Sequence, residues 1–332
     1  MIYDIIGDIH GEAGKLKALL TNLGYRHRNA AGVWRHPERM AVFVGDLVDR
    51  GAGQLEVIDI VRRMIDDGAA RAVMGNHELN AIAFYMQHPD KPGDHMRTRQ
   101  GSTGKKNRDQ HEAFVTAVVE DSVLHRETID WFTTLPLWLD LPGTGDRPGI
   151  RVAHACWDQK SIVELSPWLA PGNTLTLDHM ADATKPGHWA MDAVEILTKG
   201  PEFRLPVGHF YFDKGGSKRT KSRLKWWDDS ALTVRELAVL PGNEAAALPD
   251  IVPEGVYRPV NDKSVATFFG HYWMQGLPAP VARTMACVDY SAGVGGDLVA
   301  YRWSGEIELN VDNFVSSAAP EMNARRRMSG RI

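Results

Sequence analysis

Three short segments in the first quarter of the chain carry side chains that could do chemistry. They are residues 7–11 (G-D-I-H-G), 45–51 (G-D-L-V-D-R-G) and 75–78 (G-N-H-E). Carboxylate, imidazole and amide ligands without thiolate favour Mn²⁺, Fe²⁺ or Zn²⁺ over a structural zinc site. Asp8 and His10 are two residues apart, so in an extended backbone they point the same way and can hold one ion. The pattern predicts a site for divalent cations.

Each of these segments directly follows a predicted strand. The apolar runs 2–6, 40–44 and 71–74 end at Gly7, Gly45 and Gly75, and each is followed by a stretch with helical spacing of apolar residues, near 16–23, 55–65 and 78–86. Successive strand–helix units imply parallel strands, whose carboxyl ends meet at one edge of a sheet. The three loops should therefore converge, although they are about 30 residues apart in sequence.

Two further histidines stand at predicted strand ends and could complete a centre of two metal ions. His154 follows the apolar run 150–153, and His271 follows the run 265–270. His209, which follows Gly208, is the alternative to His271. His271 is preferred because its strand leads directly into a distinctive C-terminal segment at 288–296.

The three motifs, in this order and at this spacing, resemble those of the calcineurin-like metallophosphoesterases. The resemblance is to the phosphoprotein-phosphatase-type branch, with its bacterial serine/threonine phosphatases and diadenosine tetraphosphatases. It extends to 152–155, Gly270-His271 and 288–296, covering 1–90 closely and then isolated landmarks up to about 310. It implies an α/β fold, a four-layer α/β/β/α sandwich with two mixed sheets flanked by helices.

The resemblance also implies which residues hold the metal ions. Mn²⁺ is expected first, with Fe²⁺ or Zn²⁺ as alternatives. Asp46 would bridge the two ions. The first ion would be held by Asp8, His10 and Asp46, and the second by Asp46, Asn76, His154 and His271.

Three further residues receive catalytic roles from the same resemblance. Arg50 would bind phosphate oxygens through its planar fork. His77 would protonate the leaving group, and Asp49 would hold its imidazole in place. Glu78 would orient a ligand or loop. A hydroxide bridging the metals would attack phosphorus directly, because no serine or cysteine is placed as a covalent nucleophile.

These features leave three functions open. The first is a protein serine/threonine phosphatase-like phosphomonoesterase, and the alternative is a bis(5'-nucleosyl)-tetraphosphatase-like hydrolase. The third is a catalytically silent scaffold of the same fold. Trp273 stands where nuclease-like members carry a second histidine in G-H-x-H, which disfavours that branch, and Asp49 tilts the choice toward a phosphatase. The expected partner is a phosphorylated substrate, either a phosphoprotein or a nucleotide.

The composition limits the class of protein, its partners and its location. The chain has 332 residues, 43% of them apolar and 24% charged, with a net charge of 38 − 42 = −4. This balance is typical of a folded protein and argues against general nucleic-acid binding. No apolar run approaches the ~18 residues of a bilayer span. We therefore expect no membrane association and a location in the cytoplasm. The two cysteines are interpreted as buried thiols, and the oligomeric state stays open.

The patterns along the sequence predict one domain with two insertions and a tail. Residues 1–315 should form a metallophosphoesterase domain with insertions near 88–110 and 160–260, and 316–332 a disordered tail. The basic stretches 91–108 and 214–225 are expected to be solvated loops, with a lid for anionic substrates as the alternative. The last third is expected to be antiparallel, with a tight hairpin at Ser304-Gly305 joining strands 298–303 and 306–309. Trp226, Trp227 and Trp303 are expected in the core, and the remaining histidines, His111 and His125 among them, on the surface or in structural roles.

Overall fold

The protein is built around two mixed β-sheets. The computed structural model describes residues 2–27, 32–143, 145, 148–212, 216, 218–240 and 244–318. The first large sheet has the order β16-β15-β1-β4-β5, in which β1, β4 and β5 are parallel and β15 and β16 are antiparallel. Its strands are β1 (Ile2–Ile6), β4 (Arg39–Phe43), β5 (Ala70–Ala72), β15 (Val299–Trp303) and β16 (Phe314–Ser316).

The second large sheet has the order β14-β13-β7-β6. Strands β7, β13 and β14 are parallel, and β6 is antiparallel to β7. Its strands are β6 (Trp138–Leu141), β7 (Ile150–Ala153), β13 (Ala266–Phe269) and β14 (Met285–Cys287). The two sheets face each other through one buried cluster, to which Val42 and Tyr301 of the first sheet and Val152 and Phe268 of the second belong. This interface explains why both strand sets are apolar on successive positions.

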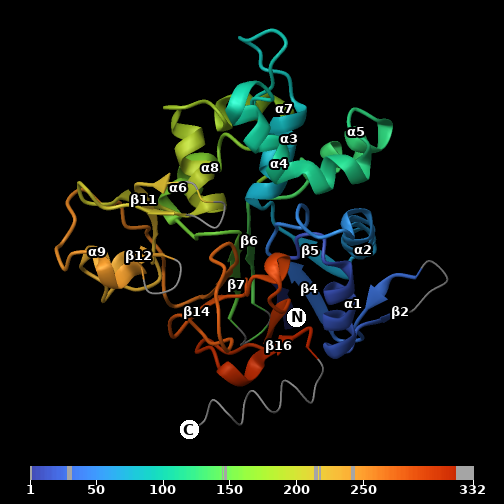
Figure 1. Ribbon diagram of the computed structural model, residues 1–332. Coiled ribbons are helices and arrows are strands. Elements are labelled where there is room, and N and C mark those ends of the chain that lie inside the picture. The colour runs from blue at the N-terminus through green and yellow to red at the C-terminus, as the bar shows by residue number, and fades with distance from the viewer. Residues whose placement is uncertain are drawn as a thin grey trace.

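Helices cover the outer face of each sheet (Figure 1). Leu16 and Leu20 of α1 pack in one cluster with Ile6 and Phe43, on the side of the first sheet that faces away from the second. The helices are α1 (Ala13–Asn22), α2 (Gln54–Asp66), α3 (Asn76–Tyr85), α4 (Gly101–Val118), α5 (Val123–Phe132), α6 (Gln159–Leu165), α7 (Leu177–Ala183), α8 (Trp189–Lys199) and α9 (Val234–Leu237), with short 3₁₀ turns η1 (Glu244–Ala247), η2 (Ala292–Val294) and η3 (Val311–Asn313). The predicted fold of two mixed sheets flanked by helices is confirmed.

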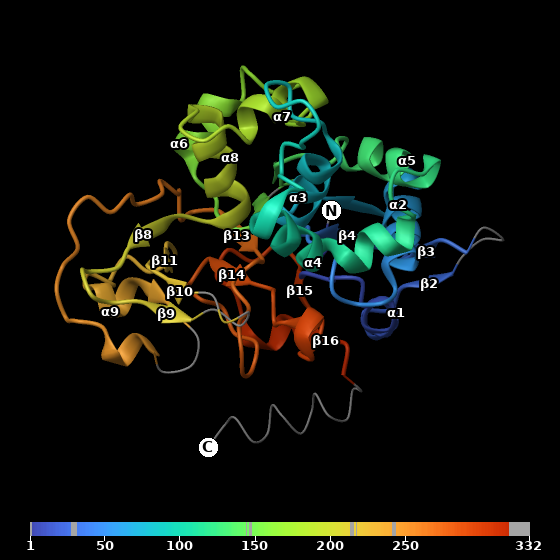
Figure 2. The same cartoon turned by 45° about the horizontal axis from the view of Figure 1, so that its top comes forward.

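Smaller sheets lie outside the sandwich. They are β2 (Arg26–His27) with β3 (Trp34–Arg35), β9 (Tyr211–Phe212) with β10 (Lys218–Arg219), and β8 (Glu202–Arg204) with β11 (Lys221–Leu224) and β12 (Ala238–Val239). Figure 2 shows β8, β11 and α9 grouped beside the second sheet. There Trp226 and Trp227 pack on Phe269, with ring centroids 4.7 and 5.3 Å away. These tryptophans, Trp303 and both cysteines are buried, as predicted.

Predictions about secondary structure are wrong in three places: 91–108, 214–225 and the last third of the chain. The second of these stretches contains strands β10 and β11 where a loop was expected. Helix α4 begins at Gly101, inside the stretch predicted as a loop, because tertiary packing overrides the weak helix propensity of residues 101–104. A Cβ at Gly104 would overlap the backbone of Arg99. Three arginines of the 91–108 stretch are also engaged rather than solvated, since Arg97 bonds Asn80 at 2.7 Å, and Arg99 and Arg108 pair with Glu120 at 2.9 Å.

The last third is only partly antiparallel. Strands β13 and β14 are parallel to each other. This pairing was not predicted, because a short apolar run carries no information about strand direction. The chain does turn at Gly305, with φ +115°, but the described residues 306–309 form no strand, and β15 pairs with β16 instead. Glu306 accepts from Ser304 N at 2.8 Å and Tyr301 Oη at 2.9 Å, which directs the chain away from a hairpin. Ser316, predicted to begin the disordered tail, instead ends β16, and the predicted tail from 319 onward lies outside the described residues.

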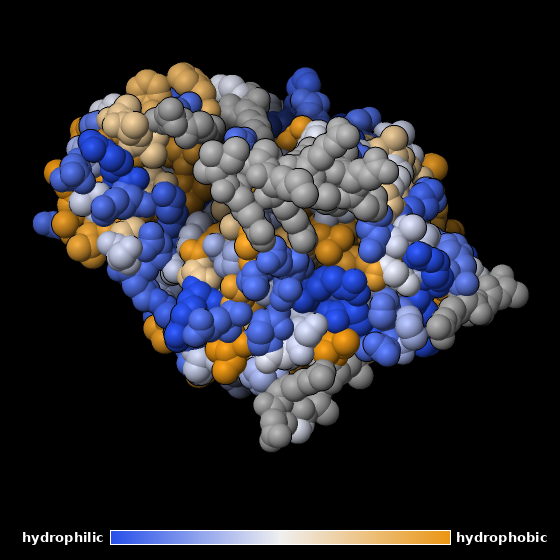
Figure 3. Space-filling model, turned by 90° about the horizontal axis from the view of Figure 1, so that it is seen from below, coloured by the Kyte–Doolittle hydropathy of each residue, from blue (hydrophilic) through white to orange (hydrophobic). Residues whose placement is uncertain are grey.

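The surface is mixed in character. Figure 3 shows hydrophilic residues over much of one face, with hydrophobic residues scattered among them. Among the described residues, each helix is too short or too polar to cross a lipid bilayer.

A buried ion pair joins three strands of the first sheet. Asp4 on β1 accepts at Oδ1 from Arg39 Nε of β4 at 2.8 Å and from Arg302 Nε of β15 at 3.2 Å. Asp4→Ala would leave Arg39, whose side chain is 7% exposed, as an unpaired buried cation. We expect the free energy of unfolding to fall by about 3–5 kcal/mol, measured by urea titration.

The matched control for this substitution is Glu308→Ala. It removes the exposed pair Arg283–Glu308, whose side chains are 73% and 68% exposed, and should change the free energy of unfolding by about 0–1 kcal/mol. Similar losses in the two variants would contradict a special role for Asp4.

Candidate metal centre

The carboxylate of Asp46 lies at the centre of the predicted site. It follows β4 and is 1% exposed. Its Oδ2 lies 3.7 Å from His10 Nε2 and 3.8 Å from His77 Nε2, and its Oδ1 lies 3.4 Å from His154 Nε2. Two groups of potential metal ligands share this residue, and within each group the ligand atoms lie within 4.8 Å of one another. The groups are His10, Asp46 and His77, and Asp46, His154 and His271.

Backbone carbonyls fix how two of these imidazoles are turned. His10 Nδ1 donates to Val48 O at 3.0 Å, and His154 Nδ1 donates to Val44 O at 2.7 Å. With Nδ1 bonded to the backbone, each Nε2 faces Asp46 and is the atom that could bind a metal ion.

The polar atoms at the centre fit a pair of cations. Asp8 Oδ1, His10 Nε2 and His271 Nε2 are buried without a hydrogen-bond partner among the described residues, and such atoms are costly unless something binds them. Asn76 Oδ1 also lies 3.1 Å from His154 Nε2, beside Asp46 Oδ1. Such convergent acceptors need a proton or a cation between them. The donor set is that of a hard or borderline divalent ion.

The electrostatics agree with this fit. Burial and the nearby carboxylates of Asp289 and Asp46 raise the pKa of Asp8 well above its usual range. Burial also lowers the pKa of His10 to about 3 and that of His271 well below its ordinary value, so both imidazoles stay neutral and able to coordinate. Bound cations would offset the repulsion among the buried carboxylates.

Glu78 and two glycines hold the loops together. Glu78, fully buried on α3, accepts from the backbone N–H groups of Asp46 at 2.9 Å, Leu47 at 2.8 Å and Gly75 at 2.9 Å. A Cβ at Gly75 would overlap Asp46 Oδ1, and one at Gly270 would overlap Asp8 Oδ1. Close approach of backbone to carboxylate is therefore built into the loops.

Backbone strain is concentrated at the same place. Several predicted site residues have positive φ, a conformation that non-glycine residues adopt at a cost of about 1–3 kcal/mol. They are His10 at +48°, Asp46 at +51°, Asp49 at +70°, Arg50 at +73° and His271 at +72°. Strain of this kind persists only where surrounding structure holds it, and it is typical of functional sites.

His77 and Arg50 flank the cluster. His77 N donates to Asp46 Oδ1 at 2.9 Å, and His77 Nδ1 donates to Asp49 Oδ2 at 2.5 Å. Burial lowers the pKa of His77, but Asp46 and Asp49 raise it more, which suits a proton donor. The Arg50 guanidinium lies 4.0 Å from the centroid of the Trp273 ring, a cation–π contact that fixes its direction.

The structure thus brings the nine predicted site residues to one edge of the two sheets. His209 belongs to neither ligand group found in the described part of the chain, whereas His271 belongs to one. Sequence reasoning missed Arg223 on β11, which donates to His271 O at 3.1 Å. His111, expected on the surface or in a structural role, is buried and bonds Asp49 Oδ1 at 2.7 Å. The available signal was its helical spacing with Phe114, Val115 and Val118.

Comparison with known proteins gives the following matches. The sequence model of the family described as calcineurin-like phosphoesterase matches residues 1–271. An asymmetrical bis(5'-nucleosyl)-tetraphosphatase of Bacillus subtilis is 38% identical over 156 residues, 47% of this chain and 57% of that protein. A symmetrical bis(5'-nucleosyl)-tetraphosphatase of Pectobacterium carotovorum is 27% identical over 273 residues, 76% of this chain and 84% of that protein. The chain thus spans little more than half the length of the Bacillus relative.

Among solved structures, one described as a putative diadenosine tetraphosphatase is 17% identical. Its TM-score is 0.43, and the match covers 95% of this chain and 92% of that one.

The shared carboxylate generates a direct prediction about metal content. We expect the protein to retain about two Mn²⁺ ions per chain after loading and gel filtration, measured by mass spectrometry of the metals. Asp46→Asn should retain fewer than about one, because the amide replaces a charged oxygen that both ions would share. His209→Ala is the matched control and should retain about two. Full occupancy in Asp46→Asn would contradict the bridging role.

Proposed function

The chain belongs to the calcineurin-like phosphoesterase family, and from that premise we propose that it is a metal-dependent hydrolase that cleaves dinucleoside polyphosphates. The observation that carries the proposal is the buried Asp46 carboxylate shared by two ligand groups. Two divalent ions held there would lower the pKa of a water and neutralise the phosphoryl oxygens. Asp8, His10 and Asp46 would hold one ion, and Asp46, Asn76, His154 and His271 the other.

The protein's own side chains would do the rest. Arg50, oriented by Trp273, would bind phosphate oxygens through its fork. His77, turned by Asp49, would give its proton to the leaving oxygen. Burial raises the pKa of both cysteine thiols, Cys156 and Cys287, well above the usual range, so neither is suited to act as a nucleophile. Direct attack by water on phosphorus is therefore favoured over a covalent intermediate.

Two observations favour a polyphosphate over a phosphoprotein as substrate. The relatives from Bacillus and Pectobacterium are both named as bis(5'-nucleosyl)-tetraphosphatases. Arg223, beside the backbone of His271, adds a second cation to Arg50 at the site, which suits a substrate with several phosphates. The protein serine/threonine phosphatase, our first expectation from the sequence, becomes the alternative. The retained ligand set speaks against a silent scaffold.

The substrate is tested by a side-by-side assay. We expect Mn²⁺-loaded protein to hydrolyse diadenosine tetraphosphate with a kcat/KM at least about tenfold above that on a phosphoserine peptide. Separating the products shows whether cleavage is symmetrical, giving two ADP, or asymmetrical, giving ATP and AMP. A preference for the peptide would restore the phosphatase function, and no turnover with any divalent metal would support the scaffold.

The role of His77 is tested by leaving groups. His77→Ala should lower kcat on an alkyl phosphate about 10²–10⁴-fold, because an alkoxide must be protonated as it leaves. The loss should be much smaller on p-nitrophenyl phosphate, and also on diadenosine tetraphosphate, whose leaving group is a nucleotide phosphate of low basicity. Equal losses on all three substrates would rule out proton donation by His77.

A further inference from the structure

A second histidine lies behind the pair formed by His77 and Asp49. Asp49 is 2% exposed, and its two carboxylate oxygens accept from different rings, Oδ2 from His77 Nδ1 at 2.5 Å and Oδ1 from His111 Nδ1 at 2.7 Å. Asp49 N donates to Gln54 Oε1 at 2.8 Å. Each oxygen of this carboxylate is thus held from one side, which leaves little freedom to rotate.

The surroundings of His111 assign it a fixed role in this chain of hydrogen bonds. Its side chain is 4% exposed, against 15% for His77. Its ring lies between Phe84 and Phe114, with centroids 5.5 and 4.9 Å away, and its Nε2 is buried without a hydrogen-bond partner in the described structure. A lone pair is cheaper to bury there than an N–H, so the proton belongs on Nδ1 and points to Asp49.

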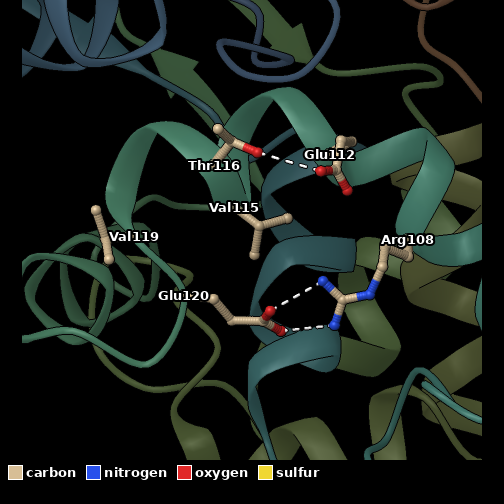
Figure 4. Close-up of a pocket in the computed structure, with 6 residues that line it drawn as sticks. All are labelled: Arg108, Glu112, Val115, Thr116, Val119 and Glu120. Atoms are coloured by element: carbon tan, nitrogen blue, oxygen red, sulfur yellow. Dashed lines mark hydrogen bonds and ion pairs between the residues drawn. The ribbon is translucent and has the colours of Figure 1, made fainter.

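Helix α4, which carries His111, is held firmly. Figures 1 and 2 show it beside α3, the helix that begins at Asn76 and carries His77. Arg108 donates to both oxygens of Glu120 at 2.9 Å. This ion pair lines a pocket on α4, whose other lining residues are Glu112, Val115, Thr116 and Val119 (Figure 4). Arg97 joins the two helices by bonds to Asn80 and Gln110, each 2.7 Å long.

We propose that His111 is a positioning residue for proton transfer, which fixes the Asp49 carboxylate so that His77 presents its Nε2 to the leaving oxygen. The inference rests on the proposed function, since it concerns His77 of the same site. His111 touches no reacting atom, and it acts only through Asp49. Its loss would leave Asp49 Oδ1 buried without a donor and free the carboxylate to turn away from His77.

Two phenyl esters of similar size test this role. Phenyl phosphate has the more basic leaving group and should depend more on His77 than p-nitrophenyl phosphate does. We expect His111→Leu to lower kcat on phenyl phosphate about tenfold or more, with KM nearly unchanged, and to lower kcat on p-nitrophenyl phosphate by less than about threefold.

Three further variants separate positioning from folding. His111→Asn keeps a donor near the place of Nδ1 and should recover kcat on phenyl phosphate to within about threefold of the wild type. His125→Leu is the matched control, since His125 is also buried against Phe114, at 5.7 Å, but bonds the backbone N of Asp121 instead of Asp49. It should affect both esters equally. In an Asp49→Ala background, His111→Leu should have no further effect.

Each outcome either supports or overturns the role of His111. A selective loss on phenyl phosphate, restored by His111→Asn and absent after Asp49→Ala, would support the inference. Equal losses on both esters, or a full effect of His111→Leu without Asp49, would overturn it and leave the proposed function intact. If the Mn²⁺-loaded wild-type protein hydrolysed neither ester nor diadenosine tetraphosphate, the proposed function would fail and the inference with it.

Discussion

The site depends on one buried carboxylate that faces imidazoles from several parts of the chain. Asp46 follows β4, while His10 follows β1 and His154 follows β7. A buried charge is costly unless it is paired, and here the partners come from two different sheets. Burial raises the pKa of Asp46, but the imidazoles around it, His154 first, lower that pKa by more than burial raises it. The carboxylate therefore stays ionised. The two sheets must therefore pack in one register for this group to exist at all.

That requirement explains features that look unfavourable taken alone. Three features lower stability: left-handed backbone at Asp46 and His271, buried carboxylates side by side, and polar atoms that have no hydrogen-bond partner among the described residues. They persist because the sheet interface and the bonds of Glu78 to three backbone N–H groups hold the loops in place. The unfavourable terms are concentrated where cations and phosphate would bind, which is typical of sites that trade stability for function.

Sequence reasoning reached the centre of the site more readily than its surroundings. Asp8, Asp46 and Asn76 directly follow strand–loop boundaries marked by glycine, and parallel strands deliver such loops to one edge, so their convergence was predictable. The parallel pairing of β13 with β14 was not, because apolar runs carry no direction. Helix α4 was half missed because Gly101 to Gly104 has poor helix propensity. The bond of His111 to Asp49 could not be predicted, because the two residues are 62 positions apart in sequence. Contacts such as Arg223 with the His271 carbonyl depend on tertiary packing that no local pattern encodes.

The most direct test of the shared carboxylate is anomalous X-ray diffraction from crystals of the Mn²⁺-loaded protein, recorded at the manganese edge. We expect two anomalous peaks about 3.5–4 Å apart, one on each side of the Asp46 carboxylate. One should lie toward His10 and the other toward His154 and His271. A single peak, or two peaks that do not both contact Asp46, would contradict this expectation.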